Sequence, residues 1–200
     1  MPGPVTGPGA SMAGSAANRR IQPAKLGILL FITAEIMFFA GMISAFAVFR
    51  FSPVQWPPAG QPRLPLEVTA VNTLILLLSG VLFQLAYNAL KASHDGLFKK
   101  WLTASAALGL IFLAVQGMEW IRLLHFGLTL RASIFGGFFY CLVGIHAVHV
   151  AGGLAAFLYV LAKAWKGAYG AGNSLGVELC RMYWFFVVGL WPILFALVYL

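Results

Sequence analysis

The chain has 200 residues, of which 61% are hydrophobic and only 9% are charged. A soluble globular domain carries about 25% charged residues, so the composition excludes a soluble enzyme or binding domain and predicts an integral membrane protein. The formal net charge of +8 comes from basic residues in short segments beside apolar runs. Such an arrangement sets membrane topology, and we expect no nucleic acid partner.

The chain begins with residues 1–25, which are rich in Gly, Ala, Ser and Pro, and we expect them to form a disordered cytoplasmic tail. Five apolar stretches follow, and each has the roughly 20 residues that a membrane-spanning helix needs. They are residues 26–49, 68–90, 102–121, 133–162 and 182–200. The sequence therefore predicts an all-α fold, an integral membrane bundle of five transmembrane helices that occupies residues 26–200.

The basic residues between these stretches predict how the bundle is oriented. Cytoplasmic loops carry an excess of Lys and Arg, and the segments on one side contain nine such residues against four on the other. The nine are Arg19, Arg20, Lys25, Lys91, Lys99, Lys100, Lys163, Lys166 and Arg181, and the four are Arg50, Arg63, Arg122 and Arg131. We therefore expect the N-terminus inside and the C-terminus outside.

Glu35 is the only ionisable residue in the first apolar stretch. A charge near the centre of a bilayer costs about 2.5–3.5 kcal/mol on insertion scales, so such a group marks a candidate functional site. Its neighbours three and four positions away are all apolar: Phe31, Ile32, Phe38 and Phe39. Either another helix supplies a partner, or Glu35 is a neutral acid, since desolvation disfavours the charged form of a carboxyl.

Polar residues in the second, third and fifth stretches have a structural interpretation. Gln116, Glu119 and Arg122 recur every three positions near one helix face, and Glu119 can pair directly with Arg122. Asn72 and Trp184 carry hydrogen-bonding groups that can join neighbouring helices. We expect these five residues to stabilise helix packing, with the ion pair at the outer membrane edge.

His146 and His149 lie three residues apart in the fourth stretch and so share one helix face. A metal site would need further ligands, for which only Glu35, Glu119 and the backbone are available. A bis-histidine haem needs ligands from opposite sides of the iron, and the other two histidines lie in loops. We favour neutral histidines that bond to neighbouring helices or to a lipid phosphate, and expect no metal, haem or copper in this chain.

Five short segments, taken in order, resemble subunit III of the haem–copper oxidases, the cytochrome c oxidase family. They are AEIMFFAGMISAFAVFR around Glu35, WPPAGQPRLPL followed by NTLILLLSG, then QGMEW, GIHAVHVAGG and YWFFVVGLW. The resemblance covers about residues 26–200 and is to the shorter, five-helix bacterial form of the subunit.

The resemblance implies a non-catalytic subunit of a terminal oxidase in the bacterial cytoplasmic (inner) membrane. Dioxygen reduction and proton pumping then belong to the complex, and haem and copper to partner subunits. The main partner would be subunit I, with subunit II and other respiratory complexes as further partners. A phospholipid-binding cleft would support sustained turnover and proton uptake, which makes Glu35, His146 and His149 candidate lipid-cleft or proton-related residues.

Two positions depart from the family pattern. Phe185 stands where the family usually has His, and Val188 where it usually has Asp. These departures leave open an accessory subunit of a quinol oxidase or nitric oxide reductase. A small proton-conducting membrane protein is a further alternative, because intramembrane Glu and His residues such as Glu35, His146 and His149 can form proton relays.

Overall fold

The structure, a computed structural model, describes residues 23–51, 66–125 and 134–199. It contains five helices: α1 (Pro23–Arg50), α2 (Leu66–Lys91), α3 (Asp95–His125), α4 (Ile134–Trp165) and α5 (Leu175–Tyr199). Each includes a segment long and apolar enough to cross a membrane, which confirms the predicted all-α bundle of five transmembrane helices. Most of the predicted tail, residues 1–22, lies outside the described residues.

Two helices begin seven residues earlier than the apolar stretches indicate. α3 begins at Asp95 rather than at residue 102, and α5 begins at Leu175 rather than at residue 182. Charged residues interrupt the apolar pattern in these first turns, but they do not interrupt the helical backbone. An acidic side chain in the first turn is also favourable there, because it faces the positive end of the helix dipole. Asp95 and Glu178 occupy such positions.

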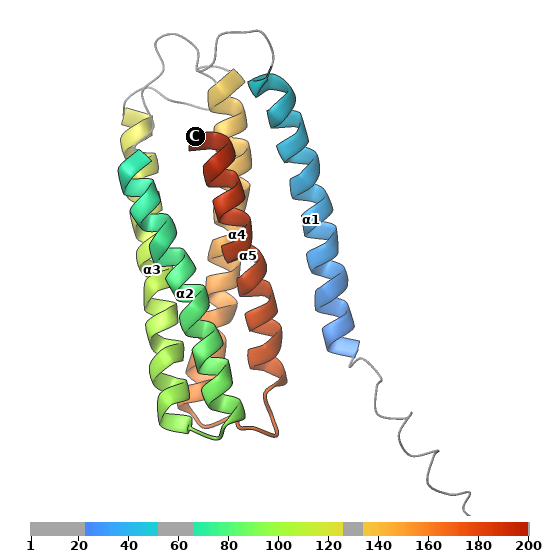
Figure 1. Cartoon of the computed structure of the whole chain (residues 1–200), viewed down its shortest axis with the longest axis vertical. Coiled ribbons are helices and arrows are strands. Elements are labelled where there is room, and N and C mark those ends of the chain that lie inside the picture. The colour runs from blue at the N-terminus through green and yellow to red at the C-terminus, as the bar shows by residue number, and fades with distance from the viewer. Residues whose placement is uncertain (1–22, 52–65, 126–133, 200) are drawn as a thin grey trace, which may run out of the picture.

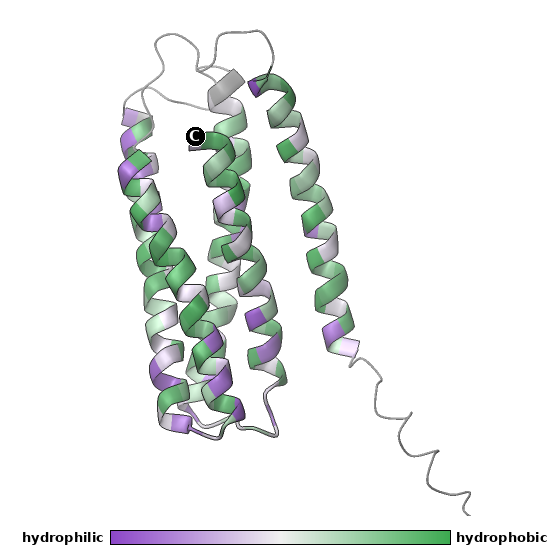
Figure 2. Ribbon diagram, in the orientation of Figure 1, coloured by the Kyte–Doolittle hydropathy of each residue, from purple (hydrophilic) through white to green (hydrophobic). Residues whose placement is uncertain are grey.

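The helices α2, α3, α4 and α5 form the body of the bundle, and α1 lies along one side of it (Figure 1). Within the described part of the chain, α1 contacts only α4 and α5. Its buried residues are Phe39 and Phe46, whereas α5 buries the two large side chains Trp184 and Trp191. Apolar residues nevertheless cover most of α1, including the part of its surface that does not contact the other helices (Figure 2).

A cluster of hydrogen bonds joins α2, α3 and α5 in the middle of the bundle. The Ser79 hydroxyl donates to the Ser105 carbonyl oxygen at 2.8 Å, and the Ser105 hydroxyl donates to the Ser79 carbonyl oxygen at 2.7 Å. The indole N–H of Trp184 donates to the Ser79 hydroxyl at 3.1 Å. Gly109 leaves the space that this indole occupies, because a Cβ there would lie 2.9 Å from Trp184 Cζ2.

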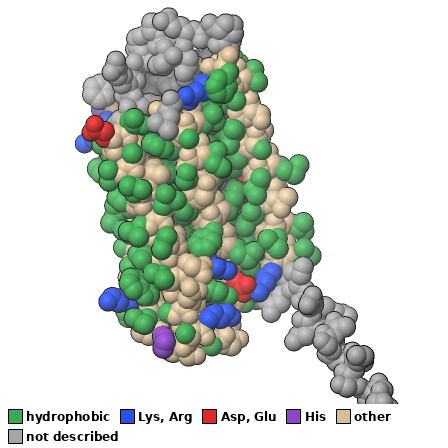
Figure 3. Space-filling model, in the orientation of Figure 1, with side chains coloured by type: hydrophobic (Ala, Val, Ile, Leu, Met, Phe, Trp, Pro, Cys, Tyr) green, Lys and Arg blue, Asp and Glu red, His purple; other side chains and the backbone are tan. Residues whose placement is uncertain are grey.

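Charged side chains concentrate towards the two ends of the bundle, and hydrophobic side chains cover the surface between them (Figure 3). α1, α3 and α5 begin at one end, where α2 and α4 finish. We call it the basic end because seven basic residues lie there: Lys25, Lys91, Lys99, Lys100, Lys163, Lys166 and Arg181. The remaining described Lys and Arg residues, Arg50 and Arg122, lie towards the opposite end.

Candidate functional site

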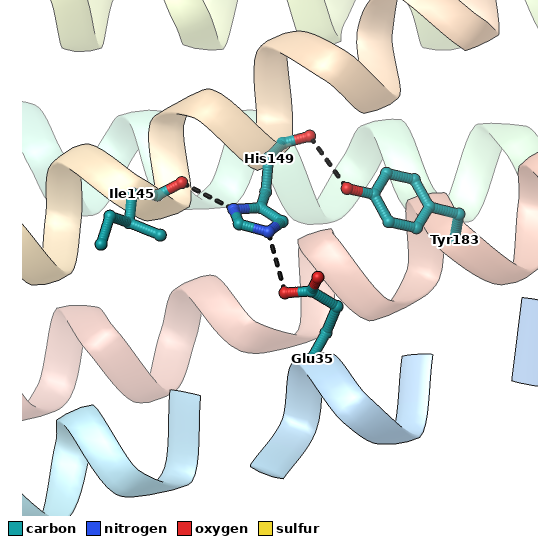
Figure 4. Close-up of polar contacts among 4 residues, drawn as sticks. All are labelled: Glu35, Ile145, His149 and Tyr183. Atoms are coloured by element: carbon teal, nitrogen blue, oxygen red, sulfur yellow. Dashed lines mark hydrogen bonds and ion pairs between the residues drawn. The ribbon is translucent and has the colours of Figure 1, made fainter. Parts of the chain in front are cut away.

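Glu35 and His149 form a direct contact between α1 and α4 (Figure 4). The Glu35 Oε2 atom lies 2.8 Å from the His149 Nε2 atom, and both side chains are about one-fifth exposed, at 18% and 19%. The sequence alone did not identify a partner for Glu35, because the neighbouring residues on the same face of its helix are apolar. The structure supplies that partner from another helix.

The second ring nitrogen of His149 determines how the proton is placed in this contact. His149 Nδ1 lies 2.8 Å from the Ile145 carbonyl oxygen (Figure 4). A carbonyl oxygen can only accept, so Nδ1 carries the hydrogen. The contact between Nε2 and Oε2 then contains a single proton, held either by Glu35 as a neutral acid or by His149 as an imidazolium. In both arrangements the pair has no net charge. The neutral Glu35 expected from the sequence stays a prediction.

Aromatic side chains surround the pair. The Tyr183 hydroxyl on α5 donates to the His149 carbonyl oxygen at 3.4 Å (Figure 4), and the Phe39 ring lies edge-on to the His149 ring at 5.2 Å between centroids. A Cβ at Gly153 would lie 2.9 Å from Tyr183 Cε1. This glycine therefore allows α4 and α5 to approach at the level of the pair.

His146 has a different environment from His149, although the two share a helix face. Its side chain is buried, at 1% exposure, and its ring stacks on Trp191 at 5.3 Å between centroids. Neither ring nitrogen has a hydrogen-bond partner among the described residues. Phe39 lies beside both histidines. The structure therefore places His146 next to the Glu35–His149 pair but gives it no hydrogen bond there.

The other predicted polar residues connect α2, α3 and α5 towards the end opposite the basic end. The Asn72 amide donates to a main-chain carbonyl of α3 at 3.1 Å and lies 3.5 Å from the Gln116 amide oxygen. Gln116 donates to the Tyr199 hydroxyl at 3.3 Å. The ion pair that the spacing allows is present, with 2.6 Å between Arg122 and Glu119. These contacts fit a structural role.

A groove of about 550 Å³ lies between α1, α4 and α5 on the basic-end side of the pair, and we call it the α1 groove. Its walls are mostly apolar, and Lys163 and Tyr169 also line it. Partial burial raises the pKa of the Tyr169 phenol, which is therefore neutral near pH 7. Tyr183 lines the same groove and hydrogen-bonds to His149, so the groove adjoins the Glu35–His149 pair.

The α1 groove was not predicted from the sequence. In the sequence, Lys163 is only one of the basic residues that predict the orientation of the bundle. A weak indication existed: Gly152 and Ala156 lie four residues apart on one face of α4. Both line the groove. Among the described residues, no atom outside the adjacent residues and the local backbone of α4 lies within 4 Å of where a Cβ at Gly152 would stand. Small residues at this spacing leave open space beside a helix when no partner helix fills it.

The two departures from the family pattern are accommodated by apolar and aromatic contacts. The Arg181 guanidinium carbon lies 4.3 Å from the Tyr87 ring centroid and 5.5 Å from that of Phe185, distances typical of cation–π interactions. Val188 is buried against Gly80, where a Cβ would lie 3.3 Å from Val188 Cγ1. In this chain, therefore, neither position needs a polar group.

No group of three or more His, Cys, Asp and Glu side chains lies in an arrangement that could hold a metal ion, within the ranges that the structure describes. The Glu35–His149 pair supplies two donor groups, and these are already bonded to one another. The pair is thus suited to hold a proton and to join α1 to α4.

Comparison with known proteins gives consistent matches. The profile of the family described as Cytochrome c oxidase subunit III matches residues 9–200. The chain is 37% identical to cytochrome c oxidase subunit 3 of Synechocystis sp. over 175 residues, which cover 87% of this chain and 74% of that protein. It is 34% identical to cytochrome c oxidase subunit 3 of Thermostichus vulcanus over 201 residues, which cover 100% and 98%. It is 31% identical to the probable cytochrome c oxidase subunit 3 of Mycobacterium leprae, with 87% and 86% covered.

Proposed function

The chain belongs to the cytochrome c oxidase subunit III family, and from this premise we propose that it is a non-catalytic, lipid-binding subunit that supports subunit I of a respiratory oxidase. Membership makes it a multi-pass membrane protein and one component of an oxidase complex. In the proposal, haem and copper reside in partner subunits, with subunit I as the main contact. The bacterial relatives favour the bacterial cytoplasmic membrane, with the basic end inside.

The observation that carries the proposal is the Glu35–His149 pair beside the α1 groove. The pair is net neutral, so it lies at membrane depth without the full cost of an isolated charge. It connects α1 to α4 next to an open apolar space. A subunit that conducted ions would need further polar groups lining a pore, whereas the walls of this space are mostly apolar.

A phospholipid fits the α1 groove better than water does. Apolar walls favour an acyl chain, since burying apolar surface is favourable by about 25 cal/mol per Å². The Lys163 ammonium, 4.8 Å from the Tyr159 ring centroid, lies at the basic end of the groove, where a lipid headgroup would be. Bound lipid would fill the space beside α1 and hold this helix in place. The proposed effect on the complex is sustained dioxygen reduction coupled to proton pumping.

Co-purification tests membership of the complex. After mild solubilisation of the native membrane, we expect this chain to travel with a haem protein and a copper protein. A chain that runs alone as a homo-oligomer with transport activity would contradict the proposal. The names of the relatives favour a cytochrome c oxidase over a quinol oxidase or a nitric oxide reductase. Measuring whether the purified complex consumes dioxygen with reduced cytochrome c as electron donor would test this.

The substitution Glu35→Gln tests the role of the pair. We expect the complex to assemble, because a glutamine amide can still donate to His149 Nε2. We expect fewer turnovers before inactivation, or less phospholipid retained after purification. Glu67→Gln, an exposed position in the first turn of α2, is the matched control. Loss of the whole complex would indicate a purely structural bond, and unchanged turnover with unchanged lipid content would refute the proposed role.

A further inference from the structure

We propose that a second groove, between α3 and the last residue of α4 at the basic end, binds the headgroup and one acyl chain of an anionic phospholipid. Lys99 and Lys100 would face the phosphate. This site is separate from the α1 groove, since α3 forms one wall and Trp165 the other. We call it the lysine groove, and it is distinct from the site of the proposed function.

The lysine groove has a volume of about 550 Å³. Small side chains on α3 create it. Thr103, Ala104 and Ala107 follow Gly96 by seven, eight and eleven positions, so the four residues share one face of the helix. Among the described residues, no atom outside the adjacent residues and the local backbone of α3 lies within 4 Å of where a Cβ at Gly96 would stand. This face of α3 is therefore open.

The charge at the groove favours an anionic occupant. Lys99 and Lys100 both line it, and neither belongs to a salt bridge within the described part of the chain. The Lys99 ammonium lies 5.8 Å from the Trp165 ring centroid, and that of Lys100 lies 5.9 Å from the Trp101 ring centroid. These aromatic rings leave the charge of each lysine uncompensated, whereas Lys25 at the same end is paired with Glu178.

The position of the groove matches the depth of a lipid. Trp165 is 60% exposed, and its indole N–H donates to the Thr103 hydroxyl at 3.3 Å. Tryptophans with one polar contact are typical of the headgroup level. From Lys100 to Ile111 the helix rises about 16 Å, roughly half of a hydrocarbon core of about 30 Å. Leu110 and Ile111 are exposed and extend the apolar face along this path.

A helix of a partner subunit is the other occupant that small residues could admit, since they allow close helix approach. It would cover Lys99 and Lys100, and no acidic residue of this chain pairs with either within the described ranges. Covering unpaired charges is costly. An anionic lipid neutralises both lysines, so the charge decides between the two occupants.

The test is native mass spectrometry of the purified, partly delipidated oxidase complex, titrated with phosphatidylglycerol or with phosphatidylethanolamine. We compare the wild-type chain with the double variant Lys99→Gln and Lys100→Gln. One phosphatidylglycerol should bind about thirtyfold more weakly to the double variant, because each lysine near an anionic headgroup contributes about 1 kcal/mol. Binding of phosphatidylethanolamine should stay nearly unchanged. Equal binding of phosphatidylglycerol to both proteins would overturn the proposal.

Two control variants separate this site from general surface attraction. Lys91→Gln with Lys166→Gln removes two charges at the same end, but neither residue lines the groove, so we expect phosphatidylglycerol binding to persist. Ala107→Phe keeps both lysines but fills the groove, and it should displace the same lipid. If the first control weakens binding equally, or the second has no effect, the groove is not the site. Cross-linking of Thr103→Cys to another oxidase subunit would show that a partner helix occupies the groove, and would also overturn the proposal.

Discussion

Removing the Glu35–His149 contact should measurably weaken the attachment of α1. Only Phe39 and Phe46 of this helix are buried, so polar contacts contribute an unusually large part of its attachment. Hydrogen bonds between transmembrane helices average about 0.6 kcal/mol and reach about 1.7 kcal/mol. At 2.8 Å, with both side chains about four-fifths buried, this bond belongs near the upper end. We expect Glu35→Ala and His149→Ala each to lower the free energy of unfolding by about 1.5–2 kcal/mol.

A double-mutant cycle isolates the contribution of the contact itself. The full chain would be unfolded reversibly in mixed detergent micelles, and the free energy of unfolding measured for the wild type, both single variants and the double variant. We expect a coupling energy of about 1–1.5 kcal/mol. Glu67→Ala combined with His149→Ala is the control pair and should be additive. A coupling below about 0.3 kcal/mol for Glu35 and His149 would refute the reasoning.

The proton arrangement at His149 gives a sharper form of the same test. Because Nδ1 donates to the Ile145 carbonyl, Nε2 can accept a hydrogen bond from an amide. Glu35→Gln should therefore cost less than half of what Glu35→Ala costs. If the two substitutions destabilise the chain equally, the proton arrangement inferred for His149 is wrong.

Two further substitutions test the packing of α5 against its neighbours. Gly109→Ala should lower stability by about 1–3 kcal/mol, because its Cβ would lie 2.9 Å from Trp184 Cζ2. Gly117→Ala on the same helix is the control, since its Cβ would meet no side chain of the non-adjacent described residues within 4 Å, and it should be nearly neutral or stabilising. Equal effects of the two substitutions in a thermal unfolding assay would contradict this. Val188→Asp, which restores the residue usual in the family, should lower stability by about 2.5–3.5 kcal/mol, because its carboxylate would be buried against Gly80. Normal yield and stability of that variant would show that a polar partner is available.

The number of helices and the polar contacts along single helices could be predicted from the sequence. Apolar length alone gives five spans, because a membrane-crossing helix needs a fixed number of residues. The pairing of Glu119 with Arg122 follows from their spacing, and the structure contains it. These features depend on residues close together in the chain, where helix geometry fixes the distances.

Contacts between helices could not be predicted in the same way. Nothing near Glu35 in the sequence identifies His149, which lies 114 positions later, and the shared face of His146 and His149 suggested one role for both. The structure gives His149 a partner and leaves His146 stacked on Trp191. Such choices depend on the rotation and depth of each helix, and these are set by large side chains such as Trp184 fitting against Gly109.

The last turns of α4 connect the two proposed lipid sites. Lys163 lines the α1 groove, and Trp165, two residues later, lines the lysine groove. Two residues along an α-helix turn the side-chain direction by about 200°, so these side chains point to opposite sides of α4. The Gly167 backbone, with φ of 75°, ends the helix directly afterwards. A one-residue insertion before Lys163 would turn both side chains by about 100°, and it should disrupt lipid binding at both grooves together. Glu35→Gln should affect only the α1 groove, and the double variant of Lys99 and Lys100 should affect only the lysine groove.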